Sequence, residues 1–194
     1  MRIHPSIASS NLLNLKDEIR FTDKNYGNIH IDIEDGNYIH NITFGNKLLN
    51  LICQNSSSNK SVHLMVNYPL DFLDSVVENK VDIVFIHIDH LRYPSEVIQE
   101  FLNKGIQVGI ALNPYAELSS KFYIKEVKNV LLMMCEPDTK NQVYLEPLEE
   151  KVKDYVLRGY DVWCDGGISI EKSEKLKYLG VANVVLGRTV FKHK

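Results

Sequence analysis

The sequence lacks several features that would place it in whole classes of protein. It has no run of about 18 apolar residues, so no membrane-spanning helix is expected. Its N-terminal residues 1–5 lack the positive start and the long apolar stretch of a signal peptide. The net charge is −3 and no basic block is present, which argues against nucleic acid or an anionic membrane as the main partner.

Cysteine is scarce. The three cysteines, Cys53, Cys135 and Cys164, are odd in number and far apart in the chain. This spacing predicts neither a disulfide framework nor a Cys-x-x-Cys metal site. We therefore expect structural thiols and a cytoplasmic location, where thiols stay reduced.

Length and composition indicate an ordinary globular protein. The chain has 194 residues, of which 44% are hydrophobic and 24% charged. This length is enough for one domain with a sizeable core and short for two. We expect residues 1–194 to form a single domain.

Short strand-like runs alternate with helical patterns along the chain. The predicted strands are Ile3–Ala8, Asn28–Ile33, Ser61–Met65, Asp82–Ile86, Gln107–Ala111, Asn129–Met133, Asp161–Cys164 and Ala182–Leu186. The predicted helices are Asn11–Thr22, Lys47–Gln54, Pro69–Glu78, Pro94–Lys104, Glu117–Lys121, Glu146–Arg158 and Ile170–Tyr178, and the Ser- and Asn-rich segment 55–60 predicts a surface loop.

Strict alternation of this kind predicts a parallel sheet with helical crossovers. Eight units favour a closed (β/α)₈ TIM barrel. A doubly wound open sheet is the alternative, but no Gly-x-Gly-x-x-Gly follows the first strand, so dinucleotide binding has no support. Eight residues, 187–194, follow the last strand, so the final helix is expected to be truncated or missing. A partner subunit could cover that gap, which favours a homo-oligomer.

The second predicted strand carries polar residues in alternation with isoleucine. Because side chains alternate faces along a strand, His30, Asp32 and possibly Glu34 share one face. A buried Asp beside a buried His requires pairing of the charge or a bound metal, so both a hydrogen-bonded pair and a metal site are open. His63, in the third strand, faces the same way as Met65 and could join His30 and Asp32, although a lone core histidine is usually structural.

The last two strands end in residues typical of ligand-binding turns. Asp165 lies at the C-terminal end of the seventh strand, where catalytic groups of barrels are found, and Gly166 and Gly167 follow it. Gly187 and Arg188 follow the eighth strand, at a common phosphate position of barrels. A plain turn and a solvated arginine are the alternative interpretations.

Taken together, these segments resemble the ribulose-phosphate 3-epimerase family. The matching stretches run in order along nearly the whole chain: Pro5-Ser6-Ile7, His30–Gly36, Asn41–Gly45, His63-Leu64-Met65, Asn113-Pro114, Asp165-Gly166-Gly167 and Gly187. His-x-Asp-x-x-Asp-Gly followed by Asn-Ile-Thr-x-Gly is a specific pattern.

The resemblance implies a role for each matching residue. His30, Asp32, His63 and Asp165 would bind one divalent metal ion: zinc, iron, manganese or cobalt. The substrate would be contacted by Ser6 and His63 near the metal, by Met65 over the reacting carbons, and by the backbone N–H groups of Gly166, Gly167 and Gly187. Arg188 does not match the family, but its position after the eighth strand would allow a further contact with the phosphate.

The resemblance also implies a reaction. Asp32 and Asp165 would exchange protons on opposite faces of C3 in a ketose phosphate, interconverting D-ribulose 5-phosphate and D-xylulose 5-phosphate through a metal-stabilised enediolate. A six-carbon substrate such as allulose 6-phosphate is a close alternative. A non-catalytic sugar-phosphate binding protein is an alternative of another class.

Three departures from the family pattern concern the substrate pocket. Residues 136–142 contain no glycine where the family has a Gly-rich loop after the sixth strand, and the altered part runs over Asp138–Gln142. Glu34 stands where the family usually has methionine, and Arg188 replaces a small residue. A pocket with these charges could suit a different sugar phosphate. His87 and Asp89, after the fourth strand, are expected in the pocket wall.

Overall fold

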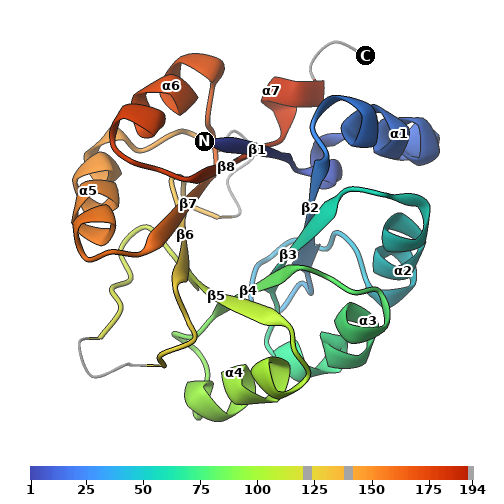
Figure 1. Ribbon diagram of the computed structural model, residues 1–194, viewed down its shortest axis with the longest axis horizontal. Helices are drawn as coiled ribbons and strands as arrows, with labels where there is room; N and C mark the ends of the chain where they lie inside the picture. The colour runs from blue at the N-terminus through green and yellow to red at the C-terminus, as the bar shows by residue number, and fades with distance from the viewer. Residues whose placement is uncertain (120–123, 138–141, 192–194) are drawn as a thin grey trace.

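The fold is a nearly closed barrel of parallel strands surrounded by helices. The computed structural model describes residues 1–119, 124–137 and 142–191, and Figure 1 shows the strands around a central axis with the helices outside them. The strands are β1 (Arg2–Pro5), β2 (Asn28–Glu34), β3 (Asn59–Met65), β4 (Ile83–His87), β5 (Gln107–Leu112), β6 (Asn129–Met133), β7 (Asp161–Asp165) and β8 (Asn183–Leu186). The predicted TIM-barrel fold is confirmed.

The strands pair in the order β1-β8-β7-β6-β5-β4-β3-β2, and every pair is parallel. The circle closes between β1 and β2 through an isolated parallel bridge of Ser6 with His30. The amide of Asn28 adds a hydrogen bond to the carbonyl of Ile3 at the same seam (3.4 Å). The closing pair is therefore the least extensive one in the barrel wall.

Seven helices in the described residues cover the outside of the sheet. They are α1 (Leu15–Asn25), α2 (Asn46–Asn55), α3 (Leu73–Glu78), α4 (Pro94–Asn103), α5 (Glu149–Leu157), α6 (Ile170–Tyr178) and α7 (Arg188–Phe191). Short 3₁₀ turns span Ile7–Ser9, Leu12–Asn14, Pro69–Phe72 and Glu146–Leu148. Helix α7 covers one turn up to residue 191, and residues 192–194 lie outside the described residues. None of the described helices has the length and apolar character needed to cross a bilayer.

Two predicted segments have different bounds in the structure. The predicted strand Ile3–Ala8 is too long: β1 ends at Pro5, and the N–H of Ser9 bonds back to the carbonyl of Ser6 in a tight turn. The loop predicted over 55–60 is shorter, because residue 55 ends α2 and residue 59 begins β3. Asp23 of α1 fixes the turn between them by accepting hydrogen bonds from Ser56, Ser57 and Ser58.

The helix predicted over Glu117–Lys121 is wrong as far as the structure describes it. Residues 117–119 form no helix, and residues 120–121 lie outside the described residues. Helix α5 secures this segment instead. The ammonium of Lys151 donates to the carbonyls of Asn113, Pro114 and Ala116. A side chain of another element thus takes up carbonyls that a helix through this segment would use, although Asn113 also accepts from the N–H of Ala116 in a turn.

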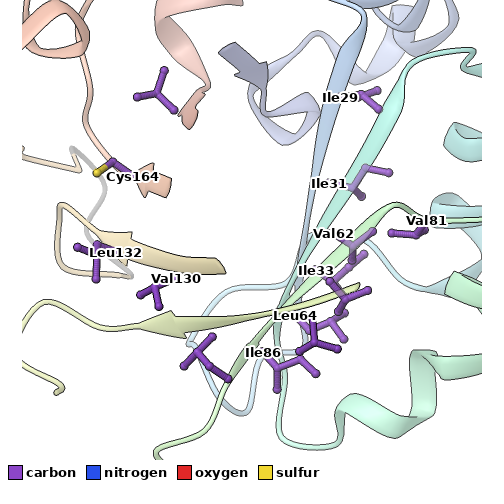
Figure 2. Packing of buried hydrophobic residues seen from close by; sticks show 14 of the residues in the cluster. Ile29, Ile31, Ile33, Val62, Leu64, Val81, Ile86, Val130, Leu132 and Cys164 are labelled. Atoms are coloured by element: carbon purple, nitrogen blue, oxygen red, sulfur yellow. The ribbon is translucent and has the colours of Figure 1, made fainter. Parts of the chain in front are cut away.

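The core consists of two layers separated by the sheet. Figure 2 shows part of the outer layer, in which Ile29, Ile31 and Ile33 of β2 lie with neighbours from β3 and β4. The inner layer fills the barrel axis with a separate apolar cluster that includes Phe85 and Trp163. A side chain at residue 109 would clash with the Phe85 ring, so glycine at that position of β5 leaves the ring its space. The predicted placement of isoleucines outside and polar residues inside is thus confirmed.

Candidate metal centre and active site

Strands β2, β3 and β7 bring four polar side chains together above the inner apolar layer. His30 and Asp32 alternate with the outward isoleucines of β2, and the register of the sheet sets Asp32 beside His63 of β3. Asp165 ends β7, on the other side of the barrel. One ligand atom from each of the four residues lies within 4.8 Å of all the others. The four residues predicted as metal ligands therefore converge.

The cluster is tight and buried. His30 Nε2 lies 3.2 Å from Asp32 Oδ1, and His63 Nδ1 lies 3.4 Å from the same oxygen. His63 Nδ1 is also 3.7 Å from Asp165 Oδ2. Both imidazoles have no solvent exposure. In such a site, unpaired polar atoms are unfavourable unless another group satisfies them.

Three atoms of this cluster fit a bound cation. Within the described part of the chain, His30 Nε2, Asp32 Oδ1 and His63 Nδ1 are buried and make no hydrogen bond of good geometry. All three point into the space that the four side chains share. Two imidazole nitrogens and two carboxylate oxygens suit zinc, iron, manganese or cobalt. The described residues therefore contain a donor set able to hold one divalent metal ion.

The charges of the cluster stabilise one another. Burial raises the pKa of Asp32, but His30 and His63 outweigh it and hold the pKa of this carboxyl well below its usual range. Burial lowers the pKa of His63, but Asp165 and Asp32 outweigh it and raise the pKa above the ordinary value. Asp32 is therefore a carboxylate at neutral pH, as a metal ligand or a base requires.

Ser6 lies just beyond the end of β1 and contacts the cluster directly. Its hydroxyl donates to Asp32 Oδ2 over 2.5 Å. The tight turn after Ser6 points this side chain toward β2. The residue that the family resemblance assigns to the substrate thus also restrains one carboxylate oxygen of Asp32.

A cavity of about 430 Å³ opens over the cluster at the C-terminal ends of the strands. Asp32, Asp165 and Met65 line one end, which we call the metal end. The turns after β7 and β8 also line the cavity, with Gly166, Gly167, Gly187 and Arg188, and we call this part the phosphate end after the role that the family resemblance implies for these glycines. Ser6 also lines the cavity, whereas His30 and His63 lie beneath its lining.

At the phosphate end, backbone conformation and close neighbours leave no room for any residue other than glycine. Gly166 and Gly167 have φ values of +106° and +65°, where residues with side chains are strained. A Cβ on Gly167 would also clash with the carbonyl of Gln142, and one on Gly187 with the hydroxyl of Ser9. Close packing of the chain on itself explains these glycines independently of any ligand.

Arg188 begins α7 beside the segment that follows β6. Its Nη2 lies 3.4 Å from Oε1 of Gln142, which adopts a left-handed φ of +42°. Asp138 and the rest of 138–141 lie outside the described residues. The guanidinium lines the cavity, so the phosphate end carries a positive charge in addition to backbone N–H groups.

Glu34 enters the cavity from the last position of β2. Its Oε2 accepts a hydrogen bond of 2.6 Å from the amide of Asn41, which also lines the cavity. Thr43 fastens this loop by donating to the carbonyl of Asp32 and accepting from the N–H of Glu34. Asn41 and Thr43 belong to the Asn-Ile-Thr stretch of the family pattern, which could have marked them as pocket residues.

His87 and Asp89 do not line the cavity, contrary to expectation. His87 is buried behind His63, with the two Nε2 atoms 2.9 Å apart. Burial, together with His63 and His90, holds the pKa of His87 well below its ordinary value. Asp89 instead accepts a 3.0 Å hydrogen bond from the hydroxyl of Tyr38, which secures the loop after β2.

Comparison with known proteins agrees with this arrangement. A model of the ribulose-phosphate 3 epimerase family matches residues 2–191. The chain belongs to the ribulose-phosphate 3-epimerase family. It is therefore an epimerase, an isomerase acting on carbohydrates.

Individual relatives span almost the whole chain. The ribulose-phosphate 3-epimerase of Helicobacter pylori strain 26695 is 35% identical over 202 residues, covering 100% of this chain and 92% of that protein. The enzyme of the same name from Encephalitozoon cuniculi is 32% identical, covering 98% of this chain and 88% of that protein.

Solved structures with low sequence identity share the fold. A mutant tryptophan synthase α-subunit from Pyrococcus furiosus superposes with a TM-score of 0.68 at 14% identity, covering 98% of this chain and 87% of that chain. KGPDC from Streptococcus mutans gives a TM-score of 0.68 at 11% identity, with coverages of 99% and 90%. At such identities these likenesses support the barrel and nothing about the reaction.

Proposed function

We propose that this epimerase inverts C3 of a ketose phosphate and interconverts D-ribulose 5-phosphate and D-xylulose 5-phosphate. The observation that carries the proposal is the pair Asp32 and Asp165, which share one metal-ligand cluster and line one cavity. They come from β2 and β7, on different sides of the barrel axis. Two carboxylates so placed can address opposite faces of a planar reacting carbon.

The proton transfers follow from this placement. One carboxylate takes the proton from C3, and the pair of electrons from the broken C–H bond passes to the C2 oxygen. The carboxylic acid on the opposite face then returns a proton to C3 as the carbonyl re-forms. General acid and base groups of this kind contribute about 10²- to 10⁴-fold each. A divalent cation on His30, Asp32, His63 and Asp165 would supply Lewis-acid stabilisation of the negative charge on oxygen.

The phosphate would bind at the other end of the cavity. The turns at Gly166, Gly167 and Gly187 offer backbone N–H groups, and Arg188 offers a charge-assisted hydrogen bond. Met65, opposite Glu34 in the register of β2 and β3, would lie over the reacting carbons. This arrangement orients C3 toward the two carboxylates and away from the phosphate.

A six-carbon ketose phosphate such as allulose 6-phosphate is a second candidate substrate. Glu34 and Arg188, which differ from the family pattern, both line the cavity. A longer sugar would move the phosphate relative to C3, and a changed set of charges around it is compatible with that shift. The proton chemistry at Asp32 and Asp165 would be the same.

Proton exchange tests the proposal. The metal-loaded protein is incubated with D-ribulose 5-phosphate in heavy water, and loss of the C3 proton is followed by NMR beside Asp165→Asn. We expect exchange with epimerisation in the wild type and its loss in the variant and after chelation of the metal. Absence of exchange with this sugar and with allulose 6-phosphate, in protein shown to carry metal, would favour the non-catalytic binding protein.

The homo-oligomer and the cytoplasmic location stay predictions. Helix α7 covers one turn, Arg188–Phe191, at the end of the described residues. We expect a second copy to cover this region. Light scattering of the purified protein gives the mass directly, and a monomer at micromolar concentration would contradict the expectation.

A further inference from the structure

The pair His63 and His87 shares one hydrogen. Their Nε2 atoms are 2.9 Å apart, the ring centroids are 5.0 Å apart and the ring planes differ by 26°, so the two rings meet nitrogen to nitrogen at their edges. Both side chains are buried, so water does not separate them. At this distance two N–H groups would collide and two lone pairs would repel, so one nitrogen donates and the other accepts.

The surroundings of His63 decide which nitrogen donates when a metal is bound. Its Nδ1 faces Asp32 Oδ1 and Asp165 Oδ2 in the metal cluster. A ligating imidazole nitrogen must present its lone pair, so the ring hydrogen of neutral His63 lies on Nε2. The acceptor that the structure gives to this N–H is Nε2 of His87.

His30 has an equivalent arrangement one strand earlier. The hydroxyl of Ser61 donates to the carbonyl of Ile29 over 3.3 Å, and Ser61 Oγ lies 2.8 Å from His30 Nδ1. With its own hydrogen engaged, Ser61 Oγ accepts from His30 Nδ1–H. The lone pair of His30 then lies on Nε2, the atom that enters the metal cluster.

We propose that His87 and Ser61 are positioning residues that fix His63 and His30 in their metal-binding tautomers and ring orientations. In both cases the partner comes from the next strand: Ser61 of β3 serves a ligand on β2, and His87 of β4 serves a ligand on β3. The inference rests on the metal centre of the proposed function. Loss of such an outer partner typically weakens metal binding about 10- to 100-fold.

Metal affinity measured without substrate tests the inference. Purified wild-type protein and variants are titrated with Zn²⁺ or Co²⁺ against a chromophoric chelator, and the Co²⁺ absorption bands report the ligand geometry. His87→Leu and His87→Phe remove the acceptor, whereas His87→Gln can return an oxygen acceptor to the same place. His4→Phe is the matched control, because His4 is also a buried barrel histidine, hydrogen-bonded to Asn183 and outside the metal cluster.

We expect His87→Leu and His87→Phe to weaken metal binding about 10- to 100-fold with altered Co²⁺ bands. His87→Gln should stay within about threefold of wild type, and Ser61→Ala should show the same direction of change as His87→Leu. Thermal unfolding of the metal-free variants identifies those that are folded. Two variants without the acceptor are used, so that the test can still be made if one of them does not fold.

Two results would overturn the inference. A folded His87→Leu protein with wild-type metal affinity would show that His87 does not hold His63. A loss in His4→Phe as large as in the His87 variants would assign the effect to core packing in general. Failure of the wild type to bind Zn²⁺ or Co²⁺ is a different result, because it removes the metal centre and the proposed function together.

Discussion

The metal end of the cavity consists mainly of side-chain groups, whereas the phosphate end consists mainly of main-chain groups. At the metal end, side chains of β2, β3 and β7 supply every donor atom, and hydroxyl or imidazole neighbours restrain them. At the phosphate end, turns after β7 and β8 present main-chain groups, and Arg188 is the charged side chain of the described cavity lining there. The first end depends on residue type and the second mainly on backbone shape.

This difference determines how each end should respond to substitution. When a ligand side chain at the metal end is removed, no other residue of the cluster can replace it, because each of the others already supplies its own ligand atom. Backbone N–H groups at the phosphate end remain after any single side chain is changed. Losses should therefore be large and affect metal binding at one end, and moderate and affect substrate binding at the other.

The largest effect is expected for His63→Ala. Removing a ligand should weaken divalent metal binding more than about 100-fold, beyond the loss typical of outer partners. The rate of C3 proton exchange should fall by about 10³, because several kcal/mol of charge stabilisation go with the metal. Chelator competition and NMR exchange measure the two quantities. Wild-type metal affinity in this variant would show that the four-residue cluster is not the metal site.

A smaller and different effect is expected for Arg188→Met. Loss of a charge-assisted hydrogen bond of about 1.5–3 kcal/mol should raise the KM for the sugar phosphate about 10- to 100-fold. The affinity for metal should stay unchanged. Steady-state kinetics beside Arg158→Met, a surface arginine of the α5 end paired with Asp154, provides the control. A fall in the metal affinity of Arg188→Met would contradict the assignment of separate roles to the two ends.

Glu34→Gln probes the boundary between the ends. Glu34 lies two residues beyond Asp32 on the same face of β2 and lines the cavity that we propose accepts the phosphate of the substrate. Removing its negative charge should lower the KM for D-ribulose 5-phosphate about fivefold, for roughly 1 kcal/mol of repulsion. Kinetics with both the five- and six-carbon sugars measure it. A rise in KM for either sugar would instead make Glu34 a ligand of a substrate hydroxyl.

The smallest effect on activity is expected for Asp23→Ala, which touches neither end. Asp23 accepts hydrogen bonds from the turn at 56–58, and their loss should lower the free energy of unfolding by about 1–3 kcal/mol. Exchange activity at 25 °C should be unchanged in the folded fraction. Denaturant unfolding measures the loss.

The pH dependence of this contribution has a definite sign. Partial burial raises the pKa of Asp23, but hydrogen bonds from Ser56 and Ser58 outweigh it and lower the pKa below the ordinary value of 3.8. The contribution is present above that ordinary value and is lost as the pH falls through the lowered pKa of the folded state. The stability difference between wild type and Asp23→Ala should therefore shrink in acid, and a constant difference from pH 7 to pH 2 would contradict the assignment.

The same contrast explains what the sequence could predict. The two-residue alternation of buried strands predicts that His30 and Asp32 share an inward face, with His63 as a possible partner. That Asp165 joins them is implied only by the family resemblance, and the structure brings all four together. The sequence predicts His87 in the pocket wall, whereas the structure buries it against His63, a contact between two strands that no local pattern indicates.

The errors in secondary structure have a related cause. The helix predicted after β5 competes with long-range hydrogen bonds from Lys151, which no local pattern indicates. The sequence marks the glycines of the phosphate end as residues of ligand-binding turns. That a side chain there would clash with Ser9 or Gln142 depends on contacts between distant segments, which the sequence does not show. Residues that act through local periodicity are readable from the sequence, whereas those that act through distant packing require the fold.

The seam between β1 and β2 links catalysis to the mechanics of the barrel. Seven strand pairs are joined by ladders, whereas this pair closes through the bridge of Ser6 with His30. The hydroxyl of Ser6 reaches Asp32 across the same seam. Any local opening of the wall at this place separates Ser6 from two metal ligands at once, and local openings start where backbone pairing is sparsest. A substitution that weakens this seam should therefore shorten the lifetime of a metal held by the proposed cluster.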